Sequence, residues 1–113
     1  MEPTNLTATV EGLLAEAVTA SSGRAARTLP LADGWALRQT VIALAGGREL
    51  GEHESPGEAT LHVLTGRVRL QAGSDAWEAS SGQLLPIPDS RHSLLALEDS
   101  AVLLTVGSAH GDH

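Results

Sequence analysis

Apolar residues near the start of the chain recur at the spacing of a helix. Between Asn5 and Ala20 they form one stripe, made of Leu6, Val10, Leu13, Leu14, Ala17 and Val18. Asn5 or Thr7 can cap the start of this helix, and Ser21-Ser22-Gly23 ends it, with Gly23 as a left-handed C-cap residue. The polar face carries no Lys or Arg, so the stripe predicts a packing face and not a membrane anchor.

From Arg24 onward, short segments show the patterning of strands separated by turn residues. The expected strands are 24–31, 35–44, 48–53, 60–64, 67–71, 76–79, 83–87, 92–97 and 101–106. Roughly eight or nine strands with turns every 8–12 residues predict a closed or double-sheet antiparallel structure. We therefore expect an N-terminal helix and connection over 1–23, a barrel over 24–107 and a flexible tail over 108–113.

Some of these strands are apolar on both faces. In 67–71 apolar and polar residues alternate strictly, but 93–97 and 102–104 are apolar at successive positions. Such strands need a cover on their outer side. The helix can cover part of it and a second subunit the rest, so we expect a homodimer. His62 has the opposite parity to Leu61 and Val63, so we expect it to point outward, toward the partner or solvent.

Composition narrows the classes of function. The 113 residues predict one domain. The formal net charge is −7 and Lys is absent, which argues against nucleic-acid binding. Cysteine is also absent, which excludes disulfides and thiolate chemistry. No apolar run approaches the roughly 20 residues that span a bilayer, and no signal peptide is evident, so we expect no membrane partner and a cytoplasmic location.

Two stretches resemble the two sequence motifs of the cupin superfamily. In the first, His53 matches the first motif histidine, Pro56-Gly57-Glu58 the usual connection, and Gly66 the closing glycine. In the second, Gly82, Pro88 and His92 match, although Ser90 replaces a glycine. The resemblance covers roughly 36–106. It implies an all-β fold: a cupin-type double-stranded β-helix, or RmlC-like jelly-roll barrel, with one N-terminal α-helix.

The metal ligands that the resemblance implies are incomplete. Metal-binding cupins usually use three histidines and one glutamate. Ser55 stands at the second histidine position and Ala59 at the glutamate position. His53 and His92 alone would hold a divalent metal (Zn, Ni, Fe or Mn) only weakly, with water or substrate completing the coordination. Glu49 or Glu58 could replace a missing ligand. We therefore assign no firm cofactor.

Three functions remain open. The preferred hypothesis is a non-catalytic, small-molecule-binding or sensory barrel with a degenerate metal site. Its pocket would be lined by His53, Ser55 and His92, with Gln39 and Arg91 as helpers and no catalytic residue. The first alternative is a metal-assisted enzyme, such as a small dioxygenase or isomerase with a two-histidine site. The second is a structural dimer module whose interior is filled by Leu and Val side chains.

The remaining candidates are expected to be structural. His110 and His113 lie in the terminal tail, where they could bind metal opportunistically. Asp89, Ser90, Ser55 and His53 include the residue types of a hydrolase triad, but no nucleophile elbow surrounds Ser55. Neither group predicts a function.

Overall fold

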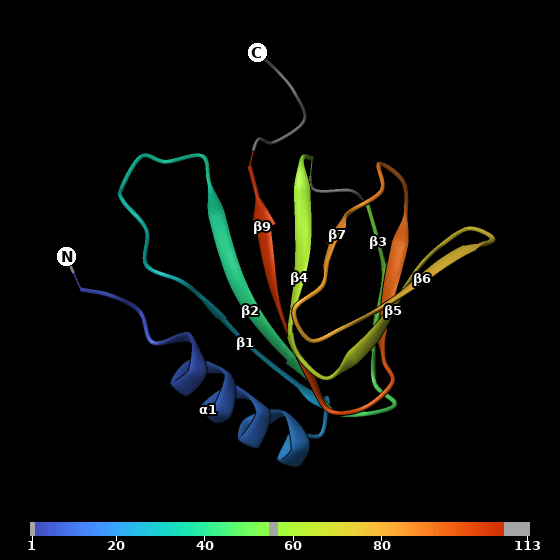
Figure 1. Cartoon of the computed structure of the whole chain (residues 1–113), viewed down its shortest axis with the longest axis horizontal. Coiled ribbons are helices and arrows are strands. Elements are labelled where there is room, and N and C mark those ends of the chain that lie inside the picture. The colour runs from blue at the N-terminus through green and yellow to red at the C-terminus, as the bar shows by residue number, and fades with distance from the viewer. Residues whose placement is uncertain (1, 55–56, 108–113) are drawn as a thin grey trace.

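The computed structural model describes residues 2–54 and 57–107, and for residues 52 and 53 it describes the backbone. One helix precedes the strands (Figure 1). In chain order the elements are α1 (Leu6–Thr19), β1 (Arg24–Thr28), β2 (Arg38–Leu44), β3 (Glu49–His53), β4 (Ala59–Thr65), β5 (Arg67–Ala72), β6 (Asp75–Ser80), β7 (Leu84–Pro86), β8 (His92–Ala96) and β9 (Ser100–Val106). The predicted all-β fold with one N-terminal helix is confirmed.

The strands form two antiparallel sheets that face each other (Figure 1). One sheet has the order β1-β2-β9-β4-β7 and the other the order β3-β8-β5-β6. Strands that are distant in the chain therefore become neighbours, as β9 does between β2 and β4. Only the assembled register decides which side chains lie opposite one another.

Aliphatic side chains from both sheets point into the space between them. In β5, Val68 and Leu70 are buried there, whereas Arg67 and Arg69 point outward, as the alternation predicts. The same core includes Leu44, Leu61, Val63, Ala79, Leu94, Ala96 and Val102. With no Phe or Tyr in the chain, the core depends on branched aliphatic packing.

Helix α1 covers the outer face of the five-stranded sheet along β1 and β2 (Figure 1). Leu13 and Ala17 are buried against Val41, Ala43 and Ala101. Because Val41 and Ala43 alternate with residues that point between the sheets, β2 is apolar on both faces. Within the described residues, no helix is both long and apolar enough to cross a membrane.

The structure confirms the predicted N-cap of the helix but not its predicted C-cap. The backbone N–H of Ala8 donates a hydrogen bond of 3.0 Å to Asn5 Oδ1, which makes Asn5 the N-cap. The helix ends at Thr19, and its C-cap is Ala20 in an extended conformation. Gly23 does have a left-handed φ of 70°, but it lies three residues beyond the cap. It belongs to the turn into β1 and not to a helix C-cap.

The first hairpin is shorter than predicted. β1 stops at Thr28 and β2 starts at Arg38, whereas the pattern predicted strands over 24–31 and 35–44. The last bond between the strands is donated by the Leu29 N–H to the Gln39 carbonyl, at 2.8 Å. Pro30 has no N–H to continue the ladder, so pairing ends there.

Candidate ligand-binding cavity

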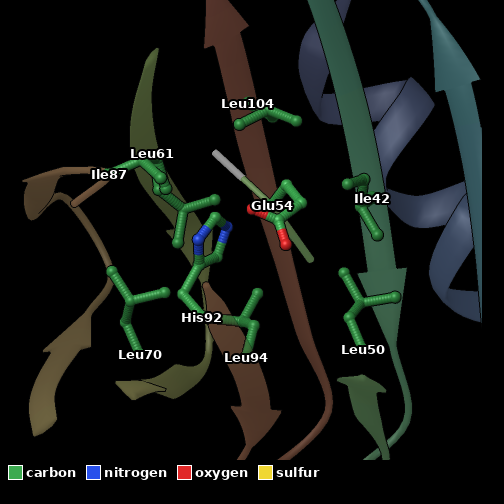
Figure 2. Close-up of a pocket in the computed structure, with 9 residues that line it drawn as sticks. All are labelled: Ile42, Leu50, Glu54, Leu61, Leu70, Ile87, His92, Leu94 and Leu104. Atoms are coloured by element: carbon green, nitrogen blue, oxygen red, sulfur yellow. The ribbon is translucent and has the colours of Figure 1, made fainter. Parts of the chain in front are cut away.

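A cavity of about 240 Å³ lies between the two sheets. Nine side chains line it (Figure 2), and seven of them are aliphatic. The aliphatic residues are Ile42, Leu50, Leu61, Leu70, Ile87, Leu94 and Leu104. The other two are Glu54 and His92. As far as the described residues line it, the cavity is therefore an apolar chamber with two polar groups.

The register of the strands brings these leucines together. In the four-stranded sheet, Leu94 pairs with Leu50 on one side and with Leu70 on the other. In the five-stranded sheet, Leu61 pairs with Leu104. Directly opposed residues point to the same face of a sheet, so these two rows form the facing walls of the chamber.

His92 begins β8, and its ring orientation is set by a local contact. Its Nδ1 lies 2.9 Å from the backbone oxygen of Ser90. A carbonyl oxygen can only accept a hydrogen bond, so Nδ1 carries the proton in this contact. Figure 2 shows the His92 ring among the aliphatic side chains of the cavity. The contact fixes the orientation of the ring through its Nδ1–H group.

Glu54 follows β3 and brings a carboxylate to the same cavity (Figure 2). Arg91 Nη1 donates a hydrogen bond of 2.6 Å to Glu54 Oε2, although both side chains are largely exposed. The pair joins the end of β3 to the segment before β8. The carboxylate therefore lines the cavity at its solvent-exposed edge, where it is paired with Arg91.

Two of the predicted site residues meet at this place. His92 lines the cavity, and Arg91 lies beside it as the partner of Glu54. The backbone of His53 pairs with His92 across β3 and β8. Ser55 lies outside the described residues, as do the tail residues His110 and His113.

Gln39 does not share this site. The sequence suggested an inward side chain because Gln39 has the parity of Leu37 and Val41. Val41, however, packs toward the helix. Gln39 lies on the same outer face, where its Nε2 donates a hydrogen bond of 3.2 Å to Thr105 Oγ1. Its role is to tie β2 to β9, because parity does not reveal which face of a two-sided strand lines the cavity.

The described residues do not make a complete metal site. Ala59 shares the inward parity of Leu61 but offers only a methyl group. Glu49 pairs with Leu95, which has the opposite parity to the inward Leu94, so Glu49 faces outward. Among the described residues, no group of three His, Cys, Asp or Glu side chains could hold a metal ion.

The sequence did not predict the part played by Glu54. Its contact with Arg91 joins residues 37 positions apart, which no local pattern encodes. A register shift between Leu50 and His53 also interrupts simple alternation in β3. Because of this shift, alternation along the sequence could not predict which residues of β3 face the cavity.

No family model matches the chain, and no curated protein matches it at the sequence level. Solved structures do resemble it. A conserved protein of unknown function from Streptococcus pyogenes has a TM-score of 0.69 and 29% identity, over 81% of this chain and 80% of that chain. A cupin 2 conserved barrel domain protein from Salinispora arenicola has a TM-score of 0.66 and 19% identity, over 79% of each chain. An RmlC-like cupin from Desulfovibrio desulfuricans has a TM-score of 0.63 and 24% identity, over 74% of this chain and 81% of that chain.

Proposed function

The chain has the fold of small cupin-domain proteins, and on that premise we propose that its barrel binds a small, mainly apolar molecule without converting it. Cupin barrels host unrelated activities, so the fold indicates only where function resides. The observation that carries the proposal is the cavity of about 240 Å³, of whose described lining side chains seven are aliphatic. An engineered cavity of about 150 Å³ in another protein takes up benzene, so this one has room for roughly ten non-hydrogen atoms.

The chemistry of the polar groups supports binding over catalysis. Of the described side chains that line the cavity, only His92 and Glu54 are polar. Ala59, at the position where the resemblance implies a glutamate ligand, offers no donor atom. A metal-assisted dioxygenase or isomerase would need a fuller set of ligands. A weakly bound divalent metal at His92 remains compatible with the binding function.

The cavity also bears on the structural-module alternative. A module without a ligand should fill its interior with Leu and Val side chains. Here Leu94 and Leu104 line an open volume of about 240 Å³. Leaving such a volume empty destabilises a core, because the lining side chains lose contacts. A ligand would restore those contacts, which favours the binding function.

Filling the cavity tests this proposal. Leu104→Trp places an indole in the chamber, and Val18→Trp is its matched control at a side chain on α1 that is 48% exposed. We expect ethylbenzene, followed by ligand-observed NMR or calorimetry, to bind the parent protein and Val18→Trp but not Leu104→Trp. Circular dichroism checks that both variants fold. Equal binding by all three proteins, or binding by none, would contradict the proposal.

We also propose that a second copy covers the part of the five-stranded sheet that α1 leaves uncovered. On this outer face His62 pairs with Leu84 of β7 and Leu103 of β9. His62 is half-buried and Leu84 is exposed, while α1 packs mainly on β1 and β2. An exposed leucine beside a half-buried histidine suits an isologous interface.

A further inference from the structure

The free edge of β1 offers a place where a further strand can add. β1 is the end strand of the five-stranded sheet, and among the described strands it pairs with β2 alone (Figure 1). We infer that this edge binds an extended acidic peptide by strand addition, and that the peptide carries two acidic residues three positions apart. No residue of β1 belongs to the described lining of the cavity, so this binding is independent of the proposed function.

The backbone of β1 has hydrogen-bonding groups to offer on this edge. The Leu29 N–H donates to the Gln39 carbonyl of β2. Because alternate residues of an antiparallel strand bond to the same neighbour, the odd-numbered residues of β1 bond to β2. Ala26 and Thr28 therefore direct their N–H and C=O groups away from β2. These four groups form a short row that an added strand can pair with.

The side chains beside this row leave room for a strand. Ala26 and Thr28 are exposed, although α1 covers the other face of β1. A groove of about 380 Å³ lies next to them, and its lining includes Ala26, Thr40, Ile42 and Leu50. Ala26 pairs with Ile42, so the two side chains share a face. An added strand would therefore place alternate side chains over small and aliphatic residues.

Two arginines give this edge a positive charge. Arg24 and Arg27 are exposed, and neither forms an ion pair with a described side chain. Glu16 lines a groove on the helix side together with Arg27 but does not pair with it. The whole chain has 14 acidic and 7 basic residues. A positive edge on an acidic protein favours an acidic partner.

The positions of the two arginines determine the spacing of the acidic residues. Arg24 and Arg27 are three residues apart, so their side chains point to opposite faces of β1. Arg24 lines the groove beside Ile42, and Arg27 lines the groove beside α1. Residues directly opposite on an added strand point to the same faces and lie within reach. One acidic residue opposite each arginine requires a spacing of three, whichever way the peptide runs.

A second copy of the chain fits this edge less well. Pairing β1 with β1 around a two-fold axis would place Arg27 opposite or diagonal to Arg27 of the other copy. Like charges across a strand pair destabilise it, whereas opposite charges stabilise it. The edge therefore suits an acidic segment of another protein better than its own copy.

Two hexapeptides of the same composition test the inference. Acetyl-Thr-Glu-Val-Thr-Glu-Thr-amide has its glutamates three apart, and acetyl-Thr-Glu-Thr-Glu-Val-Thr-amide has them two apart, so that only one can face an arginine. The first should bind roughly twofold to fivefold more tightly in an NMR titration at low salt, and less tightly at high salt. Binding should shift the backbone N–H signals of Ala26 and Thr28 and slow their exchange with solvent.

Matched variants separate the charges from the backbone edge. Arg24→Ser/Arg27→Ser should lose the preference between the peptides, whereas Arg67→Ser/Arg69→Ser, the same change of charge on the other sheet, should keep it. Ala26→Pro removes an N–H that points away from β2, which an edge strand tolerates, and should abolish binding. Ala26→Val retains this N–H and should still bind.

Several results would overturn the inference. These are equal binding of the two peptides, signal shifts away from Ala26 and Thr28, and no binding at millimolar concentration. Light scattering that shows a dimer for the parent and a monomer for Ala26→Pro would assign the edge to a second copy, which also overturns it. None of these results affects the proposed function, because ethylbenzene binding tests the cavity separately.

Discussion

Arg91 and Glu54 approach to 2.6 Å at the cavity, although 37 residues separate them in the chain. The guanidinium lies outside the lining and the carboxylate within it. The pair thereby connects the end of β3 to the segment before β8. An ion pair this exposed contributes little to stability.

Replacing Glu54 should change ligand preference. Glu54→Gln removes the negative charge from the lining, so 4-ethylbenzoate should bind more tightly than it does to the parent protein, roughly threefold or more if one unfavourable contact is removed. Glu49→Gln, which changes an outward carboxylate, should leave the affinity unchanged. Calorimetry on the three proteins decides the matter, and an unchanged or weaker affinity in Glu54→Gln contradicts the prediction.

The outer face of β4 and β7 should mediate dimer formation. Leu84→Glu would bury a charge in the proposed interface, so light scattering should show the mass of a dimer for the parent and of a monomer for the variant. Val18→Glu, at a residue that is 48% exposed on α1, serves as the control and should remain dimeric. A monomeric parent protein, or a dimeric Leu84→Glu variant, would rule out this interface.

The ion pairs on β5 and β6 predict a pH dependence of stability. Hydrogen bonds from Arg69 and then Arg67 hold the pKa of Glu78 below its usual value. A lowered pKa means that the stabilisation is complete above about pH 4.5 and is lost as pH falls through the folded-state pKa. Thermal melts should show Glu78→Gln less stable than the parent at pH 7, with the difference narrowing toward pH 3. If the difference in stability does not change with pH, the ion pairs of Glu78 with Arg67 and Arg69 are not its cause.

The aliphatic core predicts a sharp contrast between two aliphatic residues. Leu44 is 1% exposed and belongs to the core between the sheets, whereas Val18 on α1 is 48% exposed. Leu44→Ala should lower the free energy of unfolding by about 2–5 kcal/mol, and Val18→Ala by about 0.5 kcal/mol or less. Urea unfolding of both variants measures the difference. Similar losses at the two positions would contradict the assigned core.

The degenerate ligand set predicts weak metal binding. Protein prepared without an affinity tag and dialysed against a chelator should retain no stoichiometric Zn, Ni, Fe or Mn by elemental analysis. His110→Ala/His113→Ala provides the control for metal held by the terminal residues. A stoichiometric metal that this control retains and His92→Ala loses would instead support the metal-assisted enzyme.

The sequence alone determined the type of element at nearly every position. The stripe of α1 and the alternation of Val68 and Leu70 are local patterns, because a helix repeats every 3.6 residues and a strand every two. The paired motifs around His53 and His92 then identified the barrel, and His92 lies at its cavity.

Only the tertiary structure decided what the cavity contains. Gln39 and Val41 share a face, and whether that face meets α1 or the space between the sheets depends on how β2 sits beside β9. The Glu54–Arg91 contact and the row of Leu50, Leu94 and Leu70 likewise arise from register between distant strands. Alternation specifies two faces of each strand, but the packing of whole sheets decides which face lines the chamber.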